Sequence, residues 1–350
     1  MTSVANVTIQ SSQVTADLTD FPLLVDLSDM PAGFWSTVAD GGGDIRVFKA
    51  DGTTELAREV VSCDTATETG ELWIKYEGTL SSSLDTTIQI HADGASGDYA
   101  VTATYGRNNV WSDYEFVSHD GGSTESTGNF TTTADGGVVP GAVGQIGTST
   151  DFDGVGDGYT LPDGSLEATG DFTLQAWVNL DILADSNKGI ISRRNDTGGW
   201  NYSWRDRKGE SSLLIGNGAI AANTPFVTGA WLNIGVTHAS GGAVTHYRAG
   251  ASDGGGTRSG AVATPPVPLA IASDTPASID TFRINGRMDE IRARFAVLSP
   301  SQFSTEHNNQ SSPGTFYTAS VPVATGPVTP INLTTTNILP TSARLNWEQG

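Results

Sequence analysis

The chain has 350 residues, with 39 Asp or Glu against 18 Lys or Arg, so its formal net charge at pH 7 is −21. This excess of negative charge opposes binding to phosphate backbones and to anionic membrane surfaces, and it predicts that nucleic acid is not a partner. The length is sufficient for two or three domains with separate cores. The 42 glycines and the many Thr, Ser and Asp-Gly positions are typical of short strands joined by turns. We therefore predict an all-β protein built of serial β-sandwiches.

The single cysteine, Cys63, cannot form a disulfide within the chain, so stability must come from packing, bound ions or oligomerisation. We interpret Cys63 as a small core residue and expect a homo-oligomer. No apolar run approaches the roughly 20 residues that span a bilayer, so we expect no membrane insertion. Residues 1–6 also lack the basic start and apolar stretch of a secretory signal. Such a start is expected of a virion protein assembled in a host cytoplasm, and the alternative is an extracellular protein whose signal has been removed.

Apolar residues recur near period two along residues 1–110, which is typical of β-strands. Turn sequences such as Asp51-Gly52 separate the strands, and this rhythm predicts a β-sandwich domain. Trp35 and Trp73 are expected to anchor its core. The expected strands lie at residues 4–9, 21–27, 44–48, 71–76 and 86–91.

The same region resembles a family of β-sandwich domains that precede laminin-G-like domains in bacterial and phage proteins. The segments Leu18–Val25, Gly43–Val47 and Thr69–Lys75 carry this resemblance, which covers nearly all of residues 1–110. No activity is established for that family. The resemblance therefore implies a fold and a neighbouring domain, and it implies no chemistry.

Residues 111–318 contain an ordered series of turn and strand motifs. The motifs are the acidic turn Glu125–Asn129, the turns at 151–159, and the strands at 172–178, 229–238 and 288–292. Their order and spacing resemble a laminin-G-like, concanavalin A-like jelly roll. The resemblance implies a second sandwich of a kind that usually binds rather than cleaves.

The end of the chain is interpreted as a linker followed by the start of another domain. Residues 319–330 are rich in Pro and Thr, and they are expected to form a semi-stiff linker. Residues 331–350 resemble the first two strands of a fibronectin type III domain, with Trp347 as its core tryptophan. Because two strands cannot close a sandwich, we expect either that the parent protein continues or that a partner completes the domain.

No catalytic residues are predicted. A glycosidase of the related jelly-roll type needs two carboxylates on the same face of a cleft. Asp289 and Glu290 are adjacent, so in a regular strand they would point to opposite faces, and Glu68–Glu71 is interpreted as a turn. No metal-ligand spacing is found among the five histidines, which argues against zinc chemistry; they are His91, His119, His238, His246 and His307.

A structural Ca²⁺ is the cofactor that the laminin-G-like resemblance implies. Its ligands would be Glu125 and Asn129 of the acidic turn and Asp289 of the closing strand, with Asp153 as a weaker candidate. The alternative is that each carboxylate caps a turn or faces solvent. The segment from Asp151 resembles an EF-hand loop but has Val155 at a ligand position, so it is interpreted as a turn.

An aromatic stripe is the candidate carbohydrate site. Trp200, Tyr202 and Trp204 lie at alternate positions, so a strand would place all three rings on one face, with Arg205 as a polar neighbour. Such a face could stack on sugars. Equally, an inward-facing stripe would fill the core of the sandwich.

The patterns and resemblances together predict a non-enzymatic structural or adhesion protein of a tailed-phage virion, located at the tail tip, the fibre or the capsid surface. Its jelly roll would bind a glycan of the host surface, and its partners would be other virion proteins. The first alternative is a secreted bacterial adhesin or carbohydrate-binding module. A polysaccharide-degrading enzyme ranks last.

Overall fold

The computed structural model divides into two compact units, Met1–Ser320 and Val321–Gly350. The described residues are 3–194, 200–216, 218–258, 264, 266–275, 282–321, 332–339 and 342–348. Trp200 and residues 332–339 and 342–348 are described by their backbone alone.

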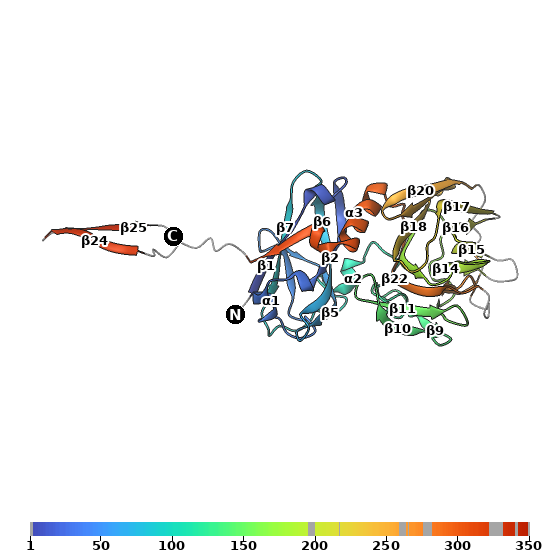
Figure 1. Ribbon diagram of the computed structural model, residues 1–350, viewed down its shortest axis with the longest axis horizontal. Helices are drawn as coiled ribbons and strands as arrows, with labels where there is room; N and C mark the ends of the chain where they lie inside the picture. The colour runs from blue at the N-terminus through green and yellow to red at the C-terminus, as the bar shows by residue number, and fades with distance from the viewer. Residues whose placement is uncertain are drawn as a thin grey trace. The chain divides into compact units, whose positions relative to one another are not determined.

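Two antiparallel sheets form the first sandwich of the larger unit (Figure 1). Five strands follow the order β23-β1-β7-β3-β4, and three follow the order β2-β6-β5. The bounds are β1 (Ser3–Ile9), β2 (Leu18–Asp26), β3 (Arg46–Lys49), β4 (Glu55–Leu56), β5 (Arg58–Asp64), β6 (Thr69–Leu80), β7 (Thr86–Ala92) and β23 (Tyr317–Ser320). Strand β23 comes from the far end of the unit and pairs with β1, so the chain returns to its first sandwich after forming the second.

Alternation of apolar residues explains the core of this first sandwich. Ala5, Val7 and Ile9 of β1 are buried, as are Ile88 and Ile90 of β7, while the residues between them are partly exposed. A period of two directs one face of a strand inward, so the strand pattern and the buried set agree.

The second sandwich is a jelly roll of two larger antiparallel sheets. One sheet has the order β10-β11-β22-β13-β18-β19-β20 with β8 beside β22, and the other has the order β17-β16-β15-β14-β21-β12-β9. The bounds are β8 (Phe116–Ser118), β9 (Thr133–Asp135), β10 (Val139–Val143), β11 (Thr148–Asp153), β12 (Gly158–Leu161), β13 (Phe172–Leu180), β14 (Asn187–Arg194), β15 (Trp200–Arg207), β16 (Glu210–Ile215), β17 (Gly218–Pro225), β18 (Leu232–His238), β19 (Ala243–Arg248), β20 (Ala251–Thr257), β21 (Leu269–Ile271) and β22 (Asn285–Arg294).

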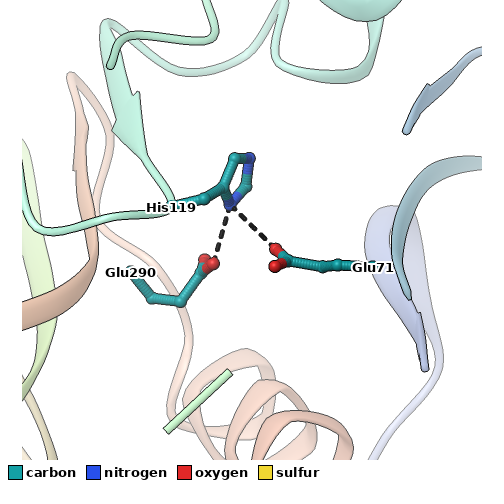
Figure 2. Close-up of side chains that lie close together, drawn as sticks. All are labelled: Glu71, His119 and Glu290. Carbon is teal, nitrogen blue, oxygen red and sulfur yellow. Dashed lines mark hydrogen bonds and ion pairs between the residues drawn. The ribbon is translucent and has the colours of Figure 1, made fainter. Parts of the chain in front are cut away.

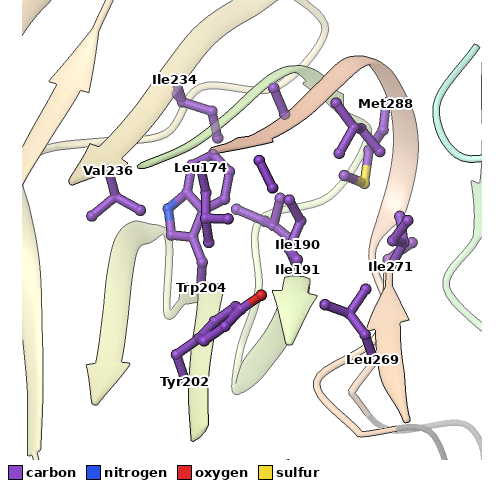
Figure 3. Packing of buried hydrophobic residues seen from close by; sticks show 14 of the residues in the cluster. Leu174, Ile190, Ile191, Tyr202, Trp204, Ile234, Val236, Leu269, Ile271 and Met288 are labelled. Atoms are coloured by element: carbon purple, nitrogen blue, oxygen red, sulfur yellow. The ribbon is translucent and has the colours of Figure 1, made fainter. Parts of the chain in front are cut away.

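The core of the jelly roll lies between these two sheets (Figure 3). Leu174 and Val236 from the first sheet and Ile191 and Trp204 from the second belong to one buried cluster. All four are 2% exposed or less. The predicted fold class is confirmed: the fold is all-β and is built of serial sandwiches.

Strand β13 is buried on both faces because helix α3 (Pro300–Ser311) covers its outer face. Leu174 points into the jelly-roll core. The outward-facing Gln175 donates to Glu306 of the helix (2.8 Å), and the indole N–H of Trp177 donates to Gln310 (2.7 Å). Helix α3 thus lies between the jelly roll and the first sandwich (Figure 1).

Helix α3 begins at a clear start signal. The hydroxyl of Ser299 accepts the backbone N–H of Gln302, and Pro300 occupies the first turn, where its missing N–H costs nothing. The remaining helical segments are short: η1 (Ser11–Gln13), η2 (Leu27–Asp29), α1 (Ala32–Trp35), α2 (Arg107–Val110) and α4 (Pro313–Phe316).

The same helix also closes the edge of the first sandwich. Strand β2 is at an edge, and the side-chain amide of Asn309 accepts the N–H of Leu24 (2.7 Å) and donates to its carbonyl oxygen (2.9 Å). Asn309 is fully buried. One amide therefore replaces the strand partner that the backbone of Leu24 lacks.

The smaller unit contains a two-stranded antiparallel ribbon, β24 (Asn332–Leu339) and β25 (Ser342–Glu348). Its assignment to a fibronectin type III domain stays a prediction, as do the division of the larger unit near residue 110 and the linker at 319–330. None of the helices in the described residues is long and apolar enough to cross a membrane.

We predict that Asn309→Ala lowers the free energy of unfolding by about 1–3 kcal/mol, because it leaves the buried backbone groups of Leu24 without partners. Urea unfolding of the whole chain measures this loss. Asn308→Ala is the matched control, since Asn308 lies on the same helix, is only partly buried and makes a single bond to the Gln13 carbonyl. Equal losses in the two variants would contradict this role of Asn309.

Candidate functional site

The two sandwiches meet at a buried apolar interface that contains three aromatic rings. The rings of Trp73 on β6 and Trp111 after α2 have centroids 5.4 Å apart. The apolar side chains of this cluster are Leu24, Ala57, Trp73, Val110, Trp111, Tyr114, Val117 and Ile146. They enclose a group of ionisable side chains, which is the most unusual feature of the molecule.

Three residues from distant segments form the centre of this group (Figure 2). His119 follows β8, Glu71 lies on β6 and Glu290 lies on β22. The Nδ1 atom of His119 is 2.7 Å from Glu290 Oε1 and 3.6 Å from Glu71 Oε1. All three residues are 4% exposed or less. Figure 2 shows both carboxylates directed at the same imidazole nitrogen.

A third carboxylate faces the other imidazole nitrogen. Glu59 Oε2 lies 3.1 Å from His119 Nε2 and also accepts the indole N–H of Trp111 (2.5 Å). The other oxygen of Glu59 accepts the hydroxyl of Ser126 (2.7 Å). Both imidazole nitrogens therefore have a carboxylate partner, and Glu59 is held in place by two donors.

These contacts decide the charge of His119. Burial opposes its charged form, but Glu290 and Glu59 outweigh that effect and raise the pKa of His119 well above its ordinary value. Burial likewise opposes ionisation of Glu290, but His119 and Arg292 lower the pKa of that carboxyl overall. The pair is an imidazolium and a carboxylate at neutral pH.

Arg292 extends the group toward helix α3. Its guanidinium donates to Glu290 (2.6 Å) and lies 3.7 Å from Glu306. The guanidinium carbon also lies 4.3 Å from the ring centroid of Trp73 and 4.9 Å from that of Trp111. Contact with two aromatic faces and two carboxylates compensates for the loss of water around a fully buried cation.

Two further acids are held in their protonated form. Burial, opposed by the nearby His119, raises the pKa of Glu71 to about 8. Burial and the neighbouring Glu290 raise the pKa of Asp289 well above its usual range. One oxygen of Asp289 accepts the N–H of Ile146 (2.9 Å), and the other is buried without a hydrogen-bond partner.

Asp289 and Glu290 correct the expectation that adjacent residues of this strand point to opposite faces. The register of β22 against β13 shifts between Gln175 and Trp177, and Glu290 has a left-handed φ of +49°. Such a bulge re-aims side chains and often occurs beside functional sites. The bulge directs both Asp289 and Glu290 into the interface between the two sandwiches.

Two clefts reach this group from the surface. The first has a volume of about 480 Å³ and is bordered by both sandwiches and the end of α3. Its polar lining consists of Asp26, Ser28, Ser62, Thr69, Glu71, Gln145, Thr148, Gln310 and Ser311. The second cleft, of about 260 Å³, is lined by Glu59 and His119 among others. The buried group therefore borders both clefts.

Two of the predicted carbohydrate residues, Tyr202 and Trp204, occupy the jelly-roll core. Tyr202 is 1% exposed and Trp204 is 0% exposed, and both pack inside the cluster shown in Figure 3. A ring without exposed surface cannot stack on a sugar, so the core alternative describes these two residues. Arg205 is also buried, 3.6 Å from Asp274. The side chain of Trp200 lies outside the described residues.

Two of the predicted calcium ligands, Glu125 and Asp153, cap turns. The backbone N–H groups of Thr127 and Gly128 donate to Glu125 (2.8 and 2.7 Å), and Asn129 donates to the carbonyl of Glu115 (3.2 Å). Asp153 is exposed and accepts the N–H of Val155 (2.6 Å).

Among the described residues, the one set of three His, Cys, Asp or Glu ligand atoms within 4.8 Å of one another is Glu71, His119 and Glu290. The structure thus does not gather Glu125, Asp153 and Asp289 into such a set. Calcium binding stays a prediction.

Sequence reasoning missed Glu59, Glu71 and His119 as functional candidates. Glu71 was assigned to a turn, whereas it lies within β6. His119 and Glu290 are 171 residues apart, so no local spacing links them. One signal was available in the sequence: Glu71 and Trp73 are two residues apart, so a strand places both side chains on one face. In the structure the carboxylate of Glu71 accepts the indole N–H of Trp73 (2.7 Å).

Residues 153–303 match the model of a family described as the concanavalin A-like lectin/glucanases superfamily. The match supports a concanavalin A-like jelly-roll fold for the second sandwich. Among the curated proteins, none matches the sequence of this chain.

Several solved structures resemble this chain. Domain 4 of AbnA, an extracellular GH43 arabinanase of Geobacillus stearothermophilus solved with arabinotriose, is 22% identical, with a TM-score of 0.45 over 56% of this chain and 98% of that chain. The sialidase of Trypanosoma rangeli is 16% identical, with a TM-score of 0.46 over 61% of this chain and 34% of that chain. The ligand-binding domain of botulinum neurotoxin serotype D, solved with N-acetylneuraminic acid, is 12% identical, with a TM-score of 0.45 over 57% and 51%. The chain thus spans about half of the toxin domain and a third of the sialidase.

We predict that the folded chain loses stability as the pH rises from about 6 to 8 in the presence of EDTA. In the folded chain Glu71 keeps a proton that the unfolded chain releases near its ordinary pKa of 4.5, and His119 keeps one that the unfolded chain releases near its ordinary pKa of 6.5, so deprotonation favours unfolding. Each such proton lowers the free energy of unfolding by up to about 1.4 kcal/mol for each pH unit. The pKa of Glu290 is lowered in the folded chain, so its effect on the free energy of unfolding appears below pH 4.5, outside this window.

Glu71→Gln tests the assignment, because glutamine can still accept from Trp73 but cannot lose a proton. Its unfolding free energy, measured in urea at pH 6, 7 and 8, should fall less steeply than that of the unaltered chain. Glu68→Gln, at an exposed turn position just before β6, should leave the slope unchanged. A slope unaffected by Glu71→Gln would show that Glu71 does not hold the proton.

We predict that Trp204→Ala lowers the free energy of unfolding by about 3–5 kcal/mol, as expected for a large side chain removed from a close-packed core. Chemical denaturation measures the loss. Phe295→Ala is the surface control, because Phe295 is 42% exposed. A Trp204→Ala variant as stable as the control would place this ring outside the core.

Proposed function

We propose that this chain is a non-enzymatic binding protein whose lectin-like jelly roll takes part in carbohydrate recognition. The observation that carries the proposal is the match of residues 153–303 to the concanavalin A-like lectin/glucanases family. A fold does not define a ligand, so the binding site has to be argued from the surface.

The first cleft is the site that we assign to the sugar. Its volume of about 480 Å³ is in the range of small-molecule sites, roughly 300–1,000 Å³. The hydroxyl and amide groups of its lining can both donate and accept hydrogen bonds, which sugar hydroxyls require. Leu24, Ile146 and Pro313 add apolar surface for the C–H face of a sugar ring.

A second candidate function is hydrolysis of a glycoside in the same cleft. Asp26 and Glu71 lie opposite each other in the register of β2 and β6, and both line the cleft. A carboxyl with a raised pKa beside a second carboxylate is the requirement for a retaining glycosidase. Binding ranks first because Asp26 accepts the N–H and hydroxyl of Ser28 (2.9 and 2.7 Å) and Glu71 is only 4% exposed.

The biological setting we propose is a tailed-phage virion, where the jelly roll would contact a host surface glycan and the other domains would contact virion proteins or further copies of the chain. The resemblance of residues 1–110 to a domain family of bacterial and phage proteins supports this setting. The alternative is a secreted bacterial adhesin or carbohydrate-binding module. Mass spectrometry of purified virions from the source phage would separate the two.

We predict that the full chain binds a subset of glycans on an array and that Gln145→Ala weakens this binding by up to about tenfold. Gln145 lines the first cleft, and a lost hydrogen bond contributes about 0.5–1.5 kcal/mol. Thr124→Ala is the control, because Thr124 lines only the second cleft. The array is read with calcium and with EDTA.

The outcomes separate the candidate functions. Loss of binding in Gln145→Ala alone supports the cleft, and equal binding in both variants places the glycan elsewhere. Release of shorter sugars from a bound glycan, abolished by Glu71→Gln, would establish the hydrolase instead. An array without any bound glycan would refute the carbohydrate proposal.

A further inference from the structure

We propose that Glu71, His119 and Glu290 form a binding site for one divalent transition-metal ion of the Zn²⁺ type, held between the two sandwiches. One imidazole nitrogen and two carboxylate oxygens are ligands that Zn²⁺ commonly takes. Glu71 also lines the cleft assigned to the sugar, but the zinc titration is carried out without sugar, so the two proposals can fail separately.

The spacing of the ligand atoms fits one ion. Tetrahedral zinc with bonds of about 2.0–2.2 Å requires its ligand atoms to be roughly 3.4 Å apart. His119 Nδ1 is 2.7 Å from Glu290 Oε1 and 3.6 Å from Glu71 Oε1, and all three ligand atoms lie within 4.8 Å of one another. Small side-chain rotations are enough to place an ion among them.

The orientation of His119 matches that of a metal ligand. Its Nδ1 faces the two proposed carboxylate ligands, while its Nε2 faces Glu59 (3.1 Å). A histidine that binds a metal through one nitrogen usually donates its other N–H to a carboxylate, which fixes the ring and strengthens the ligand. Glu59 is itself held by Trp111 and Ser126, so this support is rigid.

Asp289 provides a second observation that points to a ligand. It is 0% exposed, it lies next to Glu290, and one of its carboxylate oxygens has no hydrogen-bond donor. Buried polar atoms without partners are rare in folded proteins. A water molecule bound to the ion would supply the missing hydrogen-bond partner.

The ligands are accessible, and binding of the ion would displace the Nδ1 proton of His119 and the proton of Glu71. Arg292 occupies Glu290 Oε2 (2.6 Å), so Oε1 remains directed at the proposed ion position. Glu71 lines the first cleft, and His119 lines the second, so an ion can enter without unfolding of the interface. The ligands come from β6, from the segment after β8 and from β22, so the ion would join the two sandwiches directly.

The test is isothermal titration of the full chain with zinc chloride, after removal of metals with EDTA and dialysis. We expect one ion for each chain, with the affinity lowered at least tenfold by Glu71→Gln and about 10–100-fold by Glu59→Gln. His91→Gln is the control, because His91 is a partly buried histidine on β7, outside the group. Near-ultraviolet circular dichroism without metal checks that each variant is folded.

Diffraction at the zinc absorption edge from soaked crystals should place the ion between His119 and the two carboxylates. Absence of stoichiometric binding would overturn the proposal. So would equal zinc affinity in Glu71→Gln, Glu59→Gln and the control. Tight calcium binding at these residues with zinc excluded would overturn the choice of ion.

Discussion

The buried ion network around His119 is the interaction on which the arrangement of the two sandwiches depends. Removing charged groups from water costs several kcal/mol for each ion, and this cost is offset only when every charge finds an opposite charge or a hydrogen bond. Here Glu59 comes from the first sandwich, Glu290 and Arg292 come from the second, and His119 joins them. Separation of the sandwiches would leave each of these groups without part of its partners. The network therefore favours one relative arrangement of the two sandwiches, which apolar packing alone would not specify.

Helix α3 adds a second constraint to the same interface. Its Glu306 accepts from Gln175 of the jelly roll, and its Asn309 closes the edge of β2 in the first sandwich. A helix bonded to both neighbours transmits any displacement of one to the other. The first cleft is bordered by the end of this helix, so its shape depends on the relative position of the two domains.

Sequence periodicity predicted the strands and the fold class, because inward and outward positions alternate regularly in strands such as β1 and β7. It could not distinguish a surface stripe from a core stripe at Tyr202 and Trp204, since both have the same period. The buried network was out of reach for a different reason. Its members come from segments that only the fold brings together, and the bulge at Glu290 breaks the alternation rule that was used to dismiss that residue.

The return of the chain to its first sandwich affects how the protein can be synthesised. Strand β23 pairs with β1, and Phe316 and Tyr317 fill the first core, so that domain is incomplete until nearly the whole larger unit has left the ribosome. Domains usually fold in order as they emerge. In this chain all strands of the jelly roll emerge before β23, the last strand of the first sandwich, although the first sandwich begins earlier in the sequence. The outer edge of β1 stays open during this interval, and an open strand edge is a site of mispairing between nascent chains.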